Sequence, residues 1–198
     1  MSGTELEARR ERSRPRLGGF FRSMLREPLA VGALAPSSRF LASLMVADMR
    51  PGSRVIELGA GTGAVTQAIL DAGVRADDLI LIEQNKEFAE LLAQRFPNTT
   101  VVRGNAVSLR RHICLDSGPA DFVVSGLPLL LFPARTKARL LSQVFKSLQN
   151  NGCLYQFTYG IRCPVSRSLL RNLGLQASLM KFTPFNVPPA FVYRIARA

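Results

Sequence analysis

A glycine-rich turn over residues 59–63 carries the residue types and spacing that most clearly predict chemistry. Glycines occupy every second position, Gly59, Gly61 and Gly63, and an apolar run containing Glu57 leads directly into them. Glycine adopts positive φ and lets the backbone approach a ligand with no Cβ in the way. The pattern reads ExGxGxG, whereas turns that seat a dinucleotide pyrophosphate read GxGxxG. We expect a cofactor-binding turn here; the alternative is a tight strand-to-helix turn without a ligand.

This turn resembles motif I of the class I S-adenosylmethionine-dependent methyltransferases. In that family the glycines contact the methionine part of the cofactor, and the acidic residue, here Glu57, orders the turn. Glu83 ends the next expected strand, where a carboxylate can accept hydrogen bonds from both ribose hydroxyls. After the third strand the family usually has an acidic residue that binds the adenine amino group. Asn105 stands at that place, and its amide oxygen can accept the same hydrogen bond.

The elements that must position these residues follow from alternating short apolar runs and helical periodicity, which predict βαβ units. The expected strands are 54–58, 79–83, 99–103, 120–125, 153–158, 176–182 and 191–196. The expected helices are 62–72, 86–96, 134–148 and 165–172. The last two strands follow each other without a crossover helix, as in class I methyltransferases. We therefore expect an α/β protein with the Rossmann-like class I methyltransferase fold, a seven-stranded mainly parallel sheet with helices on both faces.

The segment after the fourth strand, 125–130 (SGLPLL), is expected beside the reacting methyl group, because ligands bind at the carboxyl ends of such strands. Methyltransferases that act on adenine carry Asn or Asp there, then two residues that typically include Pro, then an aromatic residue. This chain has no such polar residue and no aromatic residue before Phe132. The segment therefore argues against a planar base as the methyl acceptor.

Segment 125–130, together with 32–38 (GALAPSS), resembles the bacterial phospholipid N-methyltransferases of the soluble, S-adenosylmethionine-dependent type. The resemblance runs from about residue 20 to the C-terminus and includes 155–160 (YQFTYG) and 187–190 (VPPA). It implies methyl transfer to the amine of phosphatidylethanolamine and its methylated intermediates, toward phosphatidylcholine. Two other enzymes remain open, an rRNA adenine N6-dimethyltransferase and a methyltransferase of another amino-lipid such as ornithine lipid. A degenerate fold that only binds membrane or RNA is the non-enzymatic alternative.

The resemblance and the expected positions together define the candidate site. The cofactor-binding candidates for S-adenosylmethionine are Pro36, Ser37, Ser38, Glu57, Gly59, Ala60, Gly61, Thr62, Gly63, Glu83, Gln84, Gly104, Asn105, Ala106, Ser125, Gly126 and Leu127. The two serines could instead cap a helix before Phe40.

The lipid headgroup has its own candidates. Tyr155 and Tyr159 could contact the amine and stabilise methylated ammonium groups through their ring faces, or they could be core tyrosines. The substrate-binding candidates are Pro128, Arg162, Arg167, Lys181 and Arg194, the four cations being matched to a lipid phosphate. The single histidine, His112, is expected to be structural, and no metal site is expected.

Charge is distributed unevenly along the 198 residues, whose formal net charge is +12. Residues 101–198 hold thirteen Lys or Arg against only Asp116 and Asp121. Residues 17–26 place apolar and basic side chains at helical spacing, which suits an interfacial amphipathic helix. We expect a phospholipid substrate at an anionic membrane surface as the partner, and no nucleic acid.

Length and composition favour one core domain. We expect basic amphipathic membrane-binding and cofactor-capping helices over 1–50 and the methyltransferase core over 51–198. The three cysteines form no CxxC pair, and the arginine-rich start lacks the apolar core of a secretory signal. The expected location is therefore cytoplasmic, peripheral to the inner face of the cell membrane. The sequence does not fix the oligomeric state, and a monomer is the expectation.

Overall fold

The structure is a computed structural model that describes residues 36–113, 118–183 and 189–198. The chain divides into two compact units, Met1–Gly32 and Ala33–Ala198. The amphipathic helix predicted over 17–26 lies outside the described residues. Within the described ranges, no helix combines the length and the apolarity that crossing a membrane would require.

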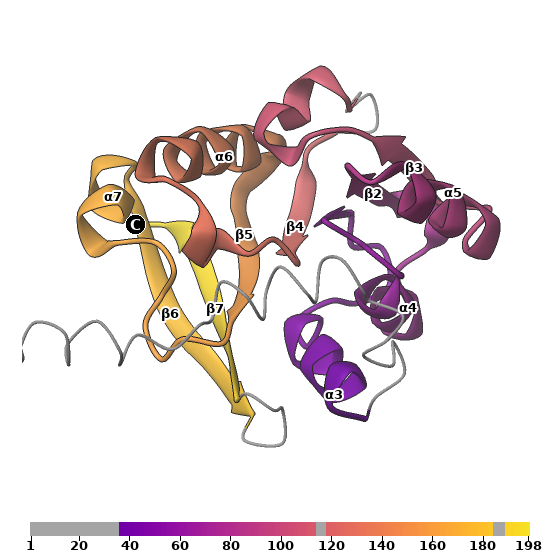
Figure 1. The fold of residues 1–198 in the computed structure, drawn as a ribbon, viewed down its shortest axis with the longest axis horizontal. Coiled ribbons are helices and arrows are strands. Elements are labelled where there is room, and N and C mark those ends of the chain that lie inside the picture. The colour runs from indigo at the N-terminus through magenta and orange to yellow at the C-terminus, as the bar shows by residue number, and fades with distance from the viewer. Residues whose placement is uncertain (1–35, 114–117, 184–188) are drawn as a thin grey trace, which may run out of the picture. The chain divides into compact units, whose positions relative to one another are not determined.

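A seven-stranded sheet with the order β3-β2-β1-β4-β5-β7-β6 forms the centre of the second unit (Figure 1). Its strands are β1 (Val55–Leu58), β2 (Leu79–Glu83), β3 (Thr100–Arg103), β4 (Ala120–Ser125), β5 (Leu148–Thr158), β6 (Leu175–Thr183) and β7 (Ala190–Arg197). The first five strands pair in parallel, and β7 runs antiparallel to both β5 and β6. Strand order reverses between β1 and β4, so the carboxyl ends of these two strands are the expected ligand site.

Helices cover both faces of this sheet, as the fold prediction required (Figure 1). The helices are α3 (Pro36–Met45), α4 (Ala64–Asp71), α5 (Lys86–Arg95), α6 (Ala134–Ser147) and α7 (Arg167–Asn172). Short 3-10 helices are η1 (Ala76–Asp78), η2 (Ala106–Arg111) and η3 (Leu129–Leu131). Buried Met45, Ile69 and Leu92 bring α3, α4 and α5 onto one face. Leu141 and Leu170 bring α6 and α7 onto the other. The class I methyltransferase fold is confirmed.

Helix α3 belongs to the same compact unit as the sheet, because that unit begins at Ala33. Residues 36–50, which the sequence grouped with the N-terminal helices, therefore belong to the second unit, and Met45, Val46 and Met49 lie in its core. The helix begins at Pro36, where a fixed φ suits the first helical position. Ser37 and Ser38 thus lie within its first turn rather than capping a helix that starts at Phe40.

The starts of α4 and β5 differ from the expected positions for identifiable reasons. The helix expected from residue 62 begins at Ala64, because Gly63 adopts φ 84° and cannot continue a right-handed helix. Strand β5 begins at Leu148 rather than at 153, so the expected helix-ending sequence Asn150–Asn151 lies inside a strand. The pairing with β4 shifts register between Ala120 and Phe122, and this irregularity accommodates the polar residues.

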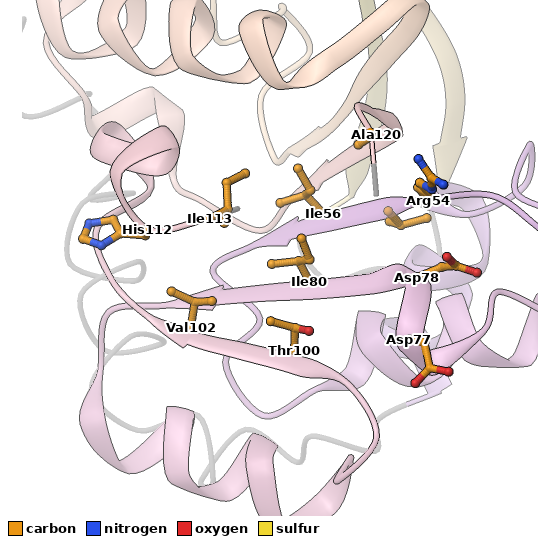
Figure 2. A pocket seen from close by; sticks show the side chains of 12 residues that line it. Arg54, Ile56, Asp77, Asp78, Ile80, Thr100, Val102, His112, Ile113 and Ala120 are labelled. Carbon is orange, nitrogen blue, oxygen red and sulfur yellow. The ribbon is translucent and has the colours of Figure 1, made fainter. Parts of the chain in front are cut away.

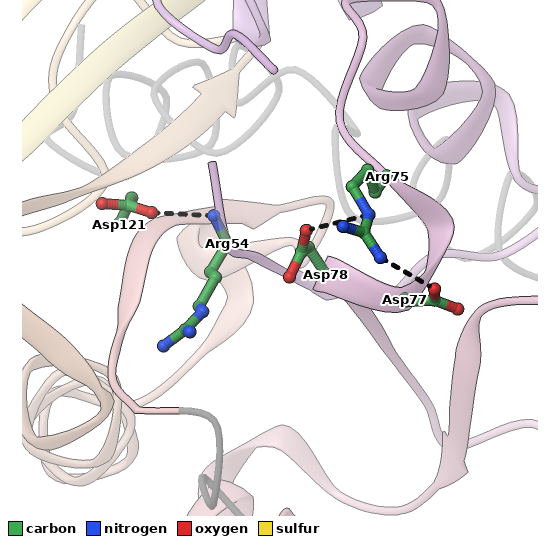
Figure 3. A network of polar contacts seen from close by, with 5 residues as sticks. All are labelled: Arg54, Arg75, Asp77, Asp78 and Asp121. Carbon is green, nitrogen blue, oxygen red and sulfur yellow. Dashed lines mark hydrogen bonds and ion pairs between the residues drawn. The ribbon is translucent and has the colours of Figure 1, made fainter. Parts of the chain in front are cut away.

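Polar contacts lie at the amino-terminal ends of strands β1, β2 and β4 and in the loops before them (Figure 3). The Arg54 amide donates to a carboxylate oxygen of Asp121 at 2.7 Å, which links the start of β1 to β4. Arg75 pairs with Asp77 at 3.3 Å and with Asp78 at 3.8 Å. These contacts lie at the edge opposite to the glycine turn, so their contribution is structural.

Candidate cofactor and methyl-transfer site

The glycine turn takes the left-handed backbone that its sequence predicts. Gly59, Gly61 and Gly63 have φ of 72°, 55° and 84°. A Cβ on Gly59 would lie 2.9 Å from the Leu127 side chain, and one on Gly63 would meet the ring of Phe96. A Cβ on Gly61 would meet nothing within 4 Å. The outer two glycines are therefore required by packing, whereas Gly61 faces open space that a cofactor can enter.

Glu83 lies directly against this turn. One carboxylate oxygen accepts from the Gly61 amide at 2.9 Å, and the other accepts from the Asn85 amide at 2.8 Å. Each oxygen keeps a further lone pair for a ribose hydroxyl. The chain thus supplies a held carboxylate beside an open, Cβ-free turn, and this donor and acceptor set fits the ribose and amino-acid parts of S-adenosylmethionine.

Glu57 connects β1 to the first helix after the turn. Its side chain is buried and accepts from the Thr66 hydroxyl at 2.7 Å. Burial removes water from the charged form and raises the pKa of Glu57 to about 8, although the Thr66 hydrogen bond opposes that shift. This contact between strand and helix gives a physical means for the predicted ordering of the turn.

Asn105 caps η2, a 3-10 helix that the sequence analysis did not predict. Its amide oxygen accepts from the Val107 amide at 2.9 Å, so an adenine amino group would have to use the second lone pair. The Gly104 amide donates to the Glu83 carbonyl at 3.0 Å. A Cβ on Gly104 would lie only 2.9 Å from the His112 ring. The ring therefore packs closely against the Gly104 backbone, which agrees with a structural role for this histidine.

The turn after β4 packs directly on the glycine turn. The Gly126 amide donates to the Leu58 carbonyl at 2.8 Å, and the Leu127 amide donates to the buried Ser125 hydroxyl at 3.3 Å. A Cβ on Gly126 would lie 2.8 Å from the Gly59 carbonyl oxygen. No side chain therefore fits at Gly126 without moving the cofactor turn.

Gln156 is a buried polar residue that the sequence analysis did not select. Its side-chain amide donates to the Leu127 carbonyl at 3.0 Å and to the Phe157 carbonyl at 2.7 Å. Its own side-chain oxygen is buried without a hydrogen-bond partner among the described residues. The available signal was a glutamine within an otherwise apolar strand segment. Gln156 fixes the carbonyl of Leu127 at the point where the methyl acceptor is expected.

The two candidate tyrosines occupy different environments. Tyr155 is 2% exposed and donates its hydroxyl hydrogen to the Asp48 carboxylate. Burial and this hydrogen bond raise its pKa. Tyr159 follows the end of β5, is half-buried, and packs its ring edge-on against Phe157 with centroids 5.5 Å apart. The geometry favours a core role for Tyr155, while contact between Tyr159 and the substrate amine stays a prediction.

The four cations proposed for a lipid phosphate do not come together. Arg162 and Arg167 line one groove on the α6–α7 face. Arg194 pairs in register with Tyr155 and interacts with it and with Cys153, both part of the core on the opposite face. The side chain of Lys181 lies outside the described residues.

The remaining candidates surround the turn or stay untested. Ala60 is buried, Gln84 is exposed just after β2, and the Thr62 carbonyl accepts from Arg95 at 2.9 Å. Pro128 immediately precedes η3. The side chains of residues 36–38 are not described, so their contact with the cofactor stays a prediction. Among the described residues, no group of three or more His, Cys, Asp or Glu side chains could hold a metal ion.

A hollow of about 300 Å³ lies away from the glycine turn (Figure 2). Ile56, Ile80 and Val102 form its apolar floor, and Arg54 and Asp78 stand near the amino-terminal ends of the strands. Because the glycine turn follows the carboxyl end of β1, this hollow is not the cofactor site.

The comparisons with known proteins agree with this geometry. Residues 55–152 match the family described as a methyltransferase domain. The chain is 35% identical to an ornithine lipid N-methyltransferase of Singulisphaera acidiphila, over 89% of this chain and 92% of that protein. The chain belongs to the class I S-adenosylmethionine-dependent methyltransferases, and S-adenosylmethionine is its cofactor.

More distant relatives modify RNA. A ribosomal RNA small subunit methyltransferase A of Prosthecochloris aestuarii is 25% identical over 65% of this chain and 44% of its own length. That of Phenylobacterium zucineum is 35% identical over 42% of this chain and 29% of its own. This chain therefore spans less than half of either enzyme.

Solved structures show the same fold at low identity. A TehB-like methyltransferase from Corynebacterium glutamicum has a TM-score of 0.64 and 14% identity, covering 93% of this chain and all (100%) of that one. A didemethyltoxoflavin N1-methyltransferase from Burkholderia thailandensis has a TM-score of 0.65 and 16% identity, covering 91% and 86%. At such identities the likeness establishes the fold alone.

Proposed function

We propose that this protein transfers methyl groups from S-adenosylmethionine to the amine of a membrane amino-lipid. An ornithine lipid is the first candidate acceptor, and phosphatidylethanolamine is the second. The observation that carries the proposal is 35% identity to an ornithine lipid N-methyltransferase over 92% of that protein. This identity favours ornithine lipid as the acceptor over phosphatidylethanolamine, which the sequence resemblance implied.

The lack of space for a side chain at Gly126 argues against adenine as the acceptor and so favours a flexible alkyl amine. Adenine-specific methyltransferases need a polar side chain at the end of this strand to hold the planar amino group. Here the Gly59 carbonyl would lie 2.8 Å from a Cβ on Gly126, so such a side chain has no space. Leu129, which is buried, begins η3 where an aromatic stacking residue would be needed.

The reaction needs proximity and deprotonation. Bound S-adenosylmethionine supplies an electrophilic methyl group on its sulfonium. The turn after β4 packs on Gly59, so the place expected for the acceptor lies beside the cofactor turn. Holding the amine close to the methyl group in this way supplies much of the rate acceleration. An alkyl ammonium has a pKa of about 10, so the amine must lose a proton before it attacks. The Leu127 carbonyl already accepts from Gln156 at 3.0 Å and from the Leu129 amide at 2.8 Å, so its two lone pairs hold the turn in place beside the expected acceptor.

Methylation of ribosomal RNA is the second candidate function, because several relatives are ribosomal RNA methyltransferases. The basic C-terminal half would suit RNA as well as an anionic membrane. Coverage counts against it, since the chain spans 44% and 29% of those two enzymes. The lack of space at Gly126 is a second argument against it.

The test uses radiolabelled S-adenosylmethionine and purified full chain in parallel reactions. One contains vesicles with ornithine lipid, one contains vesicles with phosphatidylethanolamine, and one contains ribosomal RNA. Label in extracted ornithine lipid is the expected result, and chromatography of the lipids shows how many methyl groups are added. Label confined to phosphatidylethanolamine would move the substrate to the second candidate, and label confined to RNA would contradict the proposal.

A further inference from the structure

A large groove of about 1240 Å³ lies on the α6–α7 face of the sheet. It is bordered by α6, by the loop between β5 and α7, and by α7, which Figure 1 shows on the same side of the sheet. Four cations line it: Lys137 from α6, Arg162 from the loop, and Arg167 and Arg171 from α7. Arg167 and Arg171 are four residues apart, so they project from the same side of their helix.

None of these cations has a carboxylate partner in the described part of the chain. The ion pairs found there involve Arg75 and Lys86, neither of which lines the groove. From residue 122 to the C-terminus the sequence contains no Asp or Glu. Asp121, the last acid, is engaged by the Arg54 amide and by Gln149. Within the described ranges, the groove is therefore a concentration of positive charge without paired carboxylates.

Lys137 is held at the groove wall by a structural contact. Its ammonium donates to the Pro164 carbonyl at 2.7 Å, and partial burial lowers its pKa. An anion bound nearby would favour the charged form of this lysine. Lys137 is thus positioned by the fold rather than extended freely into solvent.

Large apolar side chains stand exposed beside these cations. Ile161, next to Arg162 in the loop, is 77% exposed. Leu130 and Leu131 of η3 are 41% and 45% exposed. The position of a Cβ on Gly160 would be 3.6 Å from Leu130, which brings η3 and the loop together. Exposed apolar residues beside unpaired cations are the combination that binds an interface between anionic headgroups and acyl chains.

The groove is connected to the methyl-transfer site. Tyr193 lines it and donates its hydroxyl hydrogen to the Ile161 carbonyl at 2.6 Å. In the sheet Tyr193 pairs with Gln156, whose amide holds the Leu127 carbonyl. An occupant of the groove would therefore lie close to where the methyl acceptor is expected.

We infer that this groove, with Ile161, Leu130 and Leu131 at its rim, docks the enzyme on an anionic lipid bilayer by binding the anionic headgroup of a membrane lipid. The inference rests on the proposed function, because an enzyme that methylates a lipid must bring its site to the bilayer. It assigns part of that contact to the catalytic domain itself, in addition to the contact that the sequence predicts for the N-terminal segment.

The experiment measures binding of the full chain to phosphatidylcholine vesicles with and without phosphatidylglycerol. The test variant Arg167→Gln/Arg171→Gln removes two groove cations. The control Arg50→Gln/Lys146→Gln removes the same charge from exposed positions before β1 and at the end of α6. We expect the test variant to bind anionic vesicles at least about tenfold more weakly, because Arg167 and Arg171 line the groove that contacts the headgroups. The control should bind like the wild type, because Arg50 and Lys146 do not line the groove.

A second pair of variants tests the apolar rim. Ile161→Ser is expected to weaken vesicle binding, while Leu91→Ser, at a position 38% exposed on α5, is expected to leave it unchanged. Unaltered binding by the cation variant, or equal weakening by its control, would overturn the inference. So would a loss of affinity for RNA with vesicle binding retained.

Methyl transfer to lipid dispersed in detergent separates the two proposals. If Ile161→Ser methylates dispersed lipid normally but fails on vesicles, the docking inference is supported. If the wild type methylates no lipid in either form yet binds vesicles through the groove, the proposed function fails while docking stands.

Discussion

At the scale of single residues, the glycines of the cofactor turn have different reasons for being glycine. A Cβ on Gly59 would clash with Leu127, and a Cβ on Gly63 would clash with Phe96. Gly61 has free space instead, although its φ of 55° is unfavourable for other residues. A substitution at Gly61 can therefore separate ligand binding from folding.

Gly61→Ala should weaken S-adenosylmethionine binding at least about tenfold, because its Cβ occupies the space above the turn. Gly52→Ala is the matched control, since Gly52 also has positive φ, at 85°, and nothing within 4 Å of its Cβ. Both variants should lose about 1 kcal/mol of folding stability. Calorimetric titration and denaturant unfolding measure the two quantities, and equal cofactor affinities in the two variants would remove Gly61 from the site.

Glu57 makes stability depend on pH. Its pKa rises from 4.5 to about 8 on folding, so the folded protein holds the proton more tightly than the unfolded chain. The resulting stabilisation is fully present below about pH 4.5 and is lost as the pH rises toward 8. Glu57→Gln should flatten this part of the profile in urea unfolding at a series of pH values. An unchanged slope between those pH values would show that Glu57 titrates normally.

At the scale of elements, the C-terminal strand secures the junction between α6 and β5. The Arg197 guanidinium donates to the carbonyls of Gln149 at 2.6 Å, Asn150 at 3.2 Å and Leu148 at 3.3 Å. It also lies 5.4 Å from the ring centroid of Phe145. Because it also donates to the Phe145 carbonyl, one side chain binds carbonyls near the end of α6 and along the irregular start of β5.

Arg197→Ala should lower the free energy of unfolding by about 1–3 kcal/mol, the usual contribution of hydrogen bonds to a charged group. Arg171→Ala, at an exposed position on α7, should change it by less than about 0.5 kcal/mol. Denaturant titration of both variants measures the difference. Similar stabilities would mean that the guanidinium contacts exchange freely with water.

At the scale of the whole molecule, the cofactor site joins elements distant in sequence. The turn after β1, the end of β2 and the turn after β4 meet through Gly61 with Glu83 and through Gly59 with Leu127. Ligand binding to such a site stabilises the entire second unit, because unfolding any of these elements destroys the site.

S-adenosylmethionine at about 100 times its dissociation constant should stabilise the folded protein by about 2.7 kcal/mol. For a domain of this size that corresponds to a rise in Tm of roughly 5–10 °C. Thermal unfolding followed by circular dichroism checks the value. Gly61→Ala should show a much smaller rise at the same concentration, and Gly52→Ala should show the full rise.

The sequence by itself determined the fold class, the cofactor turn and the carboxylate at the end of β2. These features depend on local backbone requirements and on short-range periodicity: a positive φ needs glycine, and an apolar run of a few residues makes a buried strand. The approximate positions of all seven strands followed from the same signals. The charge asymmetry of the C-terminal half was also visible, because it requires only counting.

Tertiary structure alone decided which side chains meet. Tyr155 and Arg194 lie on one face of the sheet, whereas Arg162 and Arg167 line a groove on the other. The hydrogen bond from Gln156 to Leu127 and the contact that closes Gly126 join strands that are neighbours only in the sheet. Sequence spacing gives the periodicity of each strand, but face and partner depend on register and strand order, which are set by packing between distant segments.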